Sequence, residues 1–200
     1  MNKLLTGLLC ALLACGAAQA EKADALKDIK ISADNGVANT SNNGSTVEGN
    51  VIVTRGTLIL KAEKAITRED PEGYTYATFW AAPGKLATFR QKRDGGDLWV
   101  EGEAERIEYD GKLEVVKFFS RARVAQLEGA KVTQQAVGPF ISYSSRSEEV
   151  AVLNTANGES KKGGGRVEFT FQSRRKPAPA AAPGTPPAQV PVTPPAPVSN

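Results

Sequence analysis

Two short apolar runs joined by a glycine turn are the feature that most constrains the fold of this 200-residue sequence. Within residues 47–66, the run 51–53 (VIV) precedes the polar segment 54–57 (TRGT), and the run 58–60 (LIL) follows it. β-Branched residues suit a pleated surface, and glycine reaches the positive φ angles of a tight turn. The stretch therefore predicts a β-hairpin. Because adjacent positions are apolar, the hairpin either buries both faces in a core or presents one face to an apolar ligand.

Turn signals recur along the rest of the chain, about every 8–12 residues. Examples are Asp94-Gly95, Asp110-Gly111 and Asn157-Gly158. The segments between them alternate apolar and polar residues, and no segment shows the apolar period of a helix. About a dozen short strands with such spacing predict an all-β sandwich, roll or barrel.

Four local features carry further expectations. Asn35-Gly36 predicts a hairpin turn, and Gly138-Pro139 predicts a break in the chain. The alternation within residues 98–109 changes phase, which predicts a bulge or a bend between two strand pairings. A small residue followed by an acid recurs near strand ends, which indicates stacked strand layers built from related hairpins. These pairs are Ala33-Asp34, Ala62-Glu63 and Ala104-Glu105.

The start of the sequence predicts export. Residues 1–20 combine a basic start, an apolar stretch and an A-x-A motif, so they read as a signal peptide cleaved after Ala20. An alternative is the lipobox-like segment 12–16 (LLACG), in which Cys15 would be lipidated and kept. Both cysteines, Cys10 and Cys15, lie in this leader, so cleavage after Ala20 leaves no thiol.

The other end of the sequence has the composition of a tail. Residues 176–200 hold nine of the 12 prolines and are otherwise mostly alanine, valine and threonine. Proline lacks the N–H that a helix or a central strand needs, so this segment predicts a disordered Pro/Ala-rich tail. One folded domain, residues 21–175, is left between the two ends.

Several chemistries are excluded by residue type. The sequence has no histidine, which removes the common general base and most zinc sites. Glu101, Glu103 and Glu105 alternate on one strand, where they form a solvated outer face or, alternatively, a cation site or carboxylate pair. A formal charge of +3 indicates no nucleic-acid partner. We therefore expect no enzyme, no cofactor and no metal.

Four segments occur in this order along the chain: 29–34 (IKISAD), 48–66 (EGNVIVTRGTLILKAEKAI), 84–91 (GKLATFRQ) and 100–110 (VEGEAERIEYD). Together they resemble the OstA-like family of periplasmic lipopolysaccharide-transport proteins. The resemblance implies an open antiparallel β-jellyroll, a twisted two-sheet roll with an apolar groove that shields the acyl chains of lipid A. It also implies the periplasm as location, head-to-tail self-association, and the partners LptC at the inner membrane and LptD at the outer membrane.

The resemblance also implies roles for single residues. Phe89 and Tyr109 match groove-facing positions, and Ile29 and Ile31 match the N-terminal edge strand that meets the upstream partner. Where the family tends to repeat a Gly-Asn pair, this chain has Ser120-Arg121, a departure that concerns the local strand geometry. Alternation adds six further lining candidates: Val51, Val53, Leu58, Leu60, Phe118 and Val124. Ordinary core packing is the alternative role for them, because the groove wall and the core are one surface in such a fold.

A different class of protein fits the same composition. A structural adhesin or wall-associated β-sandwich would use the proline-rich tail as a spacer. A solid packed sandwich favours that alternative, whereas an open apolar slot favours lipid transport. A soluble glycan-acting enzyme is a third possibility and would need two acids facing one cleft.

Overall fold

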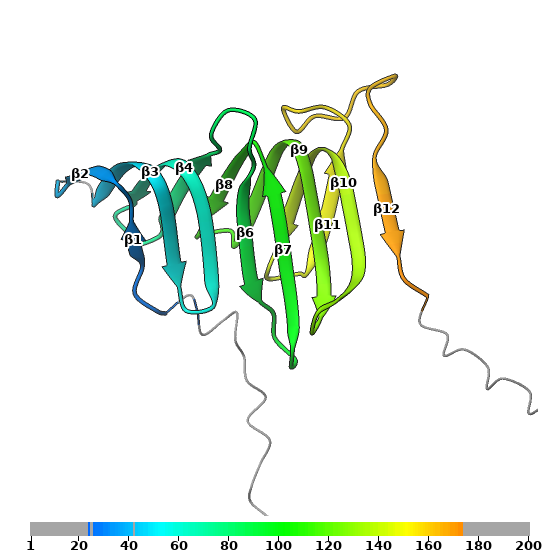
Figure 1. The fold of residues 1–200 in the computed structure, drawn as a ribbon, viewed down its shortest axis with the longest axis horizontal. Coiled ribbons are helices and arrows are strands. Elements are labelled where there is room, and N and C mark those ends of the chain that lie inside the picture. The colour runs from blue at the N-terminus through cyan, green and yellow to red at the C-terminus, as the bar shows by residue number, and fades with distance from the viewer. Residues whose placement is uncertain (1–23, 25, 42, 174–200) are drawn as a thin grey trace, which may run out of the picture.

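A single antiparallel sheet of 12 strands, folded over on itself into two layers, makes up the described chain (Figure 1). The computed structural model describes residue 24 and residues 26–41 and 43–173. The predicted signal peptide and the predicted tail lie outside these residues. The all-β prediction is confirmed. None of the described residues belongs to a helix long and apolar enough to cross a membrane.

The strands follow one another with short connections, and four of them are much longer than the sequence predicted. They are β1 (Lys30–Ser32), β2 (Asn35–Asn39), β3 (Gly44–Arg55), β4 (Leu58–Glu69), β5 (Thr75–Trp80), β6 (Ala87–Lys92), β7 (Leu98–Ala104), β8 (Arg106–Asp110), β9 (Val115–Glu128), β10 (Lys131–Ser144), β11 (Glu149–Leu153) and β12 (Glu168–Phe171).

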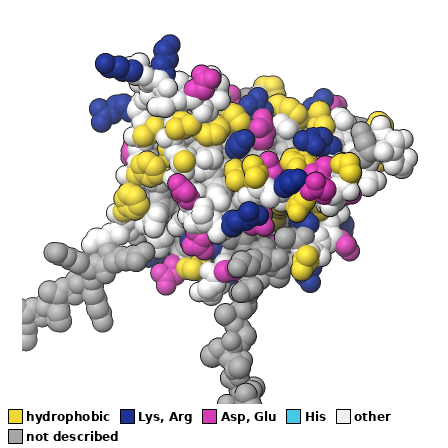
Figure 2. Space-filling model, turned by 180° about the vertical axis from the view of Figure 1, so that it is seen from behind, with side chains coloured by type: hydrophobic (Ala, Val, Ile, Leu, Met, Phe, Trp, Pro, Cys, Tyr) yellow, Lys and Arg dark blue, Asp and Glu magenta, His cyan; other side chains and the backbone are white. Residues whose placement is uncertain are grey.

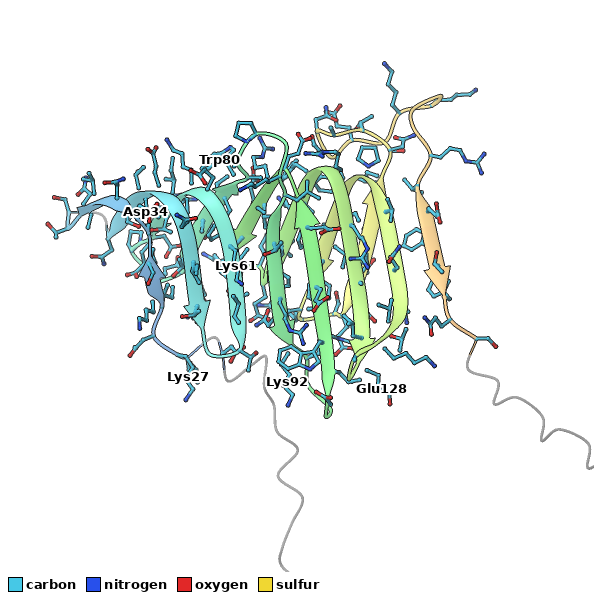
Figure 3. The ribbon with its side chains drawn as sticks, in the orientation of Figure 1. Lys27, Asp34, Lys61, Trp80, Lys92 and Glu128 are labelled. Carbon is cyan, nitrogen blue, oxygen red and sulfur yellow. The ribbon has the colours of Figure 1, made fainter. Side chains whose placement is uncertain are left out.

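The long strands β3, β4, β9 and β10 each run through both layers. In the first layer the order is β1-β3-β4-β6-β7-β9-β10-β12. In the second layer it is β2-β3-β4-β5-β8-β9-β10-β11. We call the side where the long strands cross between layers the closed edge; Asp34 and Trp80 lie along it (Figure 3). Turns of both layers face each other along the opposite side, the open edge, near Lys92 and Glu128 (Figure 3).

Two strands bend at the closed edge through pairs of residues with positive φ. Gly49 and Asn50 in β3 have φ of 80° and 48°, and Ser120 and Arg121 in β9 have φ of 61° and 52°. Ser120-Arg121 therefore adopts the same left-handed backbone as the Gly-Asn pair. The phase change predicted within 98–109 is confirmed, because β7 pairs with one half of β9 and β8 with the other.

The recurring small-acid pairs lie along this same edge. The Asp34 amide donates to the Gly49 carbonyl at 2.9 Å, and the Glu105 amide donates to the Ser120 carbonyl at 3.0 Å. In β4, Glu63 stands opposite the bulge between Glu48 and Val51 of β3. The recurring pairs of a small residue and an acid thus mark the points where the chain passes from one layer to the other.

Two local predictions, the turn at Asn35-Gly36 and the break at Gly138-Pro139, were wrong. Asn35 and Gly36 begin β2 and pair with Glu48 and Val47, because strand pairing overrides the local turn preference. Gly138-Pro139 does not end a strand; β10 continues through it with a register shift. Proline lacks the N–H for a ladder bond, and a bulge accommodates that loss.

The central hairpin is confirmed as β3 and β4, with Gly56 at a φ of 59° in the turn. Its inward row is almost fully buried. Its outward apolar row is not buried, since Ile52 and Ile59 are 41% and 37% exposed. The hairpin therefore buries one face only, and the second apolar face is open to solvent.

Candidate functional site

The predicted lining residues meet in the space between the two layers. Seven of them belong to one buried cluster that draws on both layers, and Tyr109 packs against that cluster. None of the seven is more than 5% exposed. Their positions fit a groove wall and a packed core equally, since in this structure they fill the interior themselves. The seven are Val51, Val53, Leu58, Leu60, Phe89, Phe118 and Val124.

Two of the three predicted aromatic lining residues touch across the layers. The rings of Phe89 (β6) and Phe118 (β9) meet edge to face with centroids 5.8 Å apart. The Phe118 ring lies on Gly102 of β7, where a Cβ atom would overlap it. Position 102 is therefore occupied by glycine, which leaves room in the first layer for an aromatic ring from the second layer.

A polar cavity of about 390 Å³ opens between the layers at the open edge. Leu58, Tyr109 and Val116 form its apolar wall next to the core. Charged and polar side chains form its rim, among them Arg55, Asp94, Glu114, Arg146 and Glu148. An amphiphile with apolar chains inside and a polar head outside would meet matching surfaces here.

Tyr109 sits at the boundary between the apolar interior and this polar rim. Burial raises the pKa of its hydroxyl above the ordinary 10.0, and the Arg55 guanidinium, which donates a hydrogen bond to it, acts in the opposite direction. The hydroxyl is therefore protonated at neutral pH. An aromatic ring with a polar tip suits a position where chains and head group meet.

Side chains connect the layers across the open edge. Arg93, in the turn after β6, forms an ion pair with Glu148, in the turn before β11. Arg93 also donates to the Gln126 side chain at 3.3 Å. Asp24 is buried beside the first-layer turn, where its carboxylate accepts a hydrogen bond from the Thr57 amide at 2.9 Å. The Arg93–Glu148 pair therefore joins the two layers across the open edge, whereas the Gln126 and Asp24 contacts stay within the first layer.

The N-terminal candidates lie at one end of the sheet. Ile31 is in β1, pairs with Val53 of β3 and packs against the core, and Ile29 lies just before β1 with 37% exposure. Among the described strands, β1 and β2 each pair with β3 alone. Both layers therefore present a free strand edge at this end.

The three alternating glutamates face outward and are paired with arginines of neighbouring strands. Arg90 binds Glu101, Arg121 binds Glu105 at 2.6 Å, and Arg123 lies 3.8 Å from Glu103. In the described part of the chain, no three acidic side chains come together as a metal site would require. These glutamates belong to a charged outer face of the first layer.

Two aromatic residues that were not among the sequence candidates stand at the opposite end. Phe169 and Phe171 on β12 are 45% and 66% exposed, and with Val124 and Val150 they border a second cavity of about 230 Å³. Residues 166–172 alternate apolar and polar side chains, a pattern that predicts a strand. The side of the sheet that its phenylalanines would face depended on pairing with β10.

Comparison with known proteins places this fold in a family. A family model described as the LptA/(LptD N-terminal domain) LPS transport protein matches residues 30–149. The chain belongs to this family. The resemblance seen in the sequence is thereby confirmed.

Relatives in the LptA/LptD N-terminal domain family match most of the chain. The lipopolysaccharide export system protein LptA of Escherichia coli (strain K12) is 31% identical over 173 residues, covering 81% of this chain and 92% of the relative. LptA of Haemophilus influenzae is 29% identical over 160 residues, covering 80% and 87%.

A solved structure shares the fold. It is the crystal structure of LptH, the LptA-homologous periplasmic component of the lipopolysaccharide transport device from Pseudomonas aeruginosa. The two match with a TM-score of 0.64 at 21% identity, over 75% of this chain and 99% of LptH. The predicted open β-jellyroll is confirmed at the level of the fold.

Proposed function

We propose that this chain shields the acyl chains of lipopolysaccharide between its two layers and passes the lipid across the periplasm, from the inner-membrane complex to the outer-membrane translocon. The observation that carries the proposal is the apolar interior, which both layers line and which meets a polar cavity at the open edge. Leaving an acyl chain in water costs about 0.8 kcal/mol per methylene group, so a lipid in transit needs such cover.

The filled interior shapes how the lipid would enter. Backbone strands join the layers at the closed edge, whereas side-chain contacts such as Arg93–Glu148 join them at the open edge. Acyl chains enter by parting the layers there and displacing residues such as Phe89 and Phe118. A solid adhesin would show an equally packed interior, but membership of a transport family supports the lipid carrier.

A photo-reactive residue placed at Phe89 or Tyr109 tests this function. We expect it to label bound lipopolysaccharide, because both positions face the space between the layers. The matched control is Arg90, which lies next to Phe89 and is paired with Glu101 on the outer face. Labelling from Arg90 alone would overturn the proposal. A charged residue in place of Phe89 or Tyr109 should weaken lipid binding.

The free edges of β1 and β2 support strand addition as the way in which neighbours join. The proposal includes LptC as the partner at this end, LptD at the outer membrane, and head-to-tail joining of copies. Ile31→Asp should weaken capture of the upstream partner in a pull-down. Ile29→Asp changes a more exposed side chain, so a loss of capture by this variant reflects lost pairing with the partner and not lost folding. Unchanged capture by both folded variants contradicts this part.

A further inference from the structure

The last strand exposes two aromatic rings at the end of the molecule. The rings of Phe169 and Phe171 are stacked at an interplanar angle of 8°, with centroids 6.2 Å apart. Hydrophobic side chains are visible at this end in Figure 2, on the left of the view. We call Phe169 and Phe171 the aromatic lip. Exposed aromatic surface of this kind is costly in water, so an apolar contact is its simplest use.

The register of β12 aims the lip at the interior. Phe169 pairs with Ala136 of β10, and Phe171 pairs with Gln134. Residues directly opposite each other in an antiparallel pair point to the same face. Ala136 is 3% exposed and belongs to the interior cluster. The rings therefore lie on the interior side of the sheet, while Glu168 and Thr170 lie on its outer side.

Open space separates the lip from the rest of the interior. The cavity of about 230 Å³ is bounded by the lip with Val124, Ala136 and Val150, and by the polar residues Gln126, Gln134, Gln135 and Glu148. Val124 is part of the buried cluster, and Val150 packs against it. The apolar surface between the layers therefore continues to the C-terminal end of the roll. Here it surrounds unfilled space, unlike the packed middle.

We propose that the aromatic lip is an acyl-chain subsite at the C-terminal mouth of the roll. This inference rests on the proposed function and names residues for it. A neighbouring strand would bind the backbone edge of β12, whereas the rings face the space that continues the interior. The family match ends at residue 149, so the lip lies beyond the matched segment.

Site-specific photo-crosslinking in the full exported chain tests the subsite. A benzophenone side chain at position 169 or 171 should label purified lipopolysaccharide, and the same group at Thr170 should not. Lipopolysaccharide stripped of its acyl chains should label at neither ring position. The reference position is Phe89: if Phe89 labels and 169 and 171 do not, the subsite is wrong and the proposed function stands. If no position labels, the proposed function fails first.

A binding measurement supplies the second test. The double variant Phe169→Ser/Phe171→Ser should bind lipopolysaccharide about tenfold more weakly, which corresponds to about 1.4 kcal/mol. The matched control, Glu168→Ser/Thr170→Ser, changes the outer side of the same strand and should bind normally. All four side chains are exposed, so melting temperatures should not move. Equal affinity of both double variants, or crosslinking of the lip to a second copy of the chain, overturns the subsite.

Discussion

The closed edge and the open edge join the same two layers by different means. At the closed edge, β3, β4, β9 and β10 cross from layer to layer as continuous backbone. At the open edge, the contacts described are between side chains, among them Arg93 with Glu148 and Arg55 with Tyr109. Parting the layers at the open edge breaks no strand. The closed edge can therefore act as a hinge, and the two layers can part along the open edge.

The bends in β3 and β9 adopt the same left-handed backbone with different residue types. Gly49 pays no steric penalty at positive φ, whereas Ser120 and Arg121 do. The second bend has compensating contacts: Arg121 binds Glu105 at 2.6 Å and donates to the Lys85 carbonyl at 3.2 Å. Strand pairing, and not residue type alone, fixes the bend.

The largest expected effect is at the glycine bend. Gly49→Ala should lower the free energy of unfolding by about 2–3 kcal/mol, because φ is +80° and the new Cβ would lie 2.5 Å from a carboxylate oxygen of Asp34. Urea denaturation measures the loss. Gly73→Ala is the control, with φ of +86° but open space around the Cβ, and should cost about 1 kcal/mol. Equal losses would show that the crowding by Asp34 is unimportant.

A smaller effect is expected at the open edge. Glu148→Gln removes the charge partner of Arg93, whose side chain is only 11% exposed. We expect a loss of about 1 kcal/mol that shrinks at high salt, together with stronger binding of an apolar dye as the layers part more often. Glu149→Gln changes an exposed neighbour and should do neither. Loss of stability without added dye binding would contradict the idea that the layers part along the open edge.

The serine bend offers a stabilising change. Ser120→Gly should raise the free energy of unfolding by about 0.5 kcal/mol, since relief of the left-handed strain outweighs the added freedom of the unfolded chain. Thermal or urea unfolding measures it. Ser120→Val, which is branched at Cβ, should destabilise instead. A loss of stability from both variants would mean that the Ser120 side chain itself supports the bend.

The smallest effect concerns pH. Burial raises the pKa of the Tyr109 hydroxyl above 10.0, so the folded chain keeps a proton that the unfolded chain releases. This stabilisation is fully present below pH 10 and is lost as the pH rises through the folded-state pKa. Tyr109→Phe should therefore flatten the alkaline fall in stability, measured by urea unfolding along a pH series. An unchanged alkaline fall would place the Tyr109 hydroxyl in water.

Local patterns were enough to predict the central hairpin and its inward row, because alternation and a glycine turn are properties of neighbouring residues. They failed at Asn35-Gly36, where pairing with β3 decides the conformation and a Cβ on Gly36 would lie 2.9 Å from Val47. The left-handed backbone of Ser120 and Arg121 has no local signal, since it follows from the crossing of β9 between layers.

The placement of the candidate residues in the fold could be predicted from the same kinds of pattern. Alternation and family resemblance together selected residues that do meet between the layers, such as Phe89 and Phe118. They did not indicate that the interior is filled or that Tyr109 borders a polar rim. Those properties depend on the distance between two layers whose strands are remote in sequence. Phe169 and Phe171 were missed because their facing depends on the register with β10.

The bends constrain how the length of this chain can change. In β9, even-numbered residues point inward on both sides of the bend, as Phe118 and Ala122 do, because the bend inserts a pair of residues. In β3, Val47 and Val51 keep the odd positions inward for the same reason. One added residue would turn an apolar row outward in one whole layer. Insertions at the closed edge should therefore be accepted in twos, whereas the loop 70–74 should accept them singly.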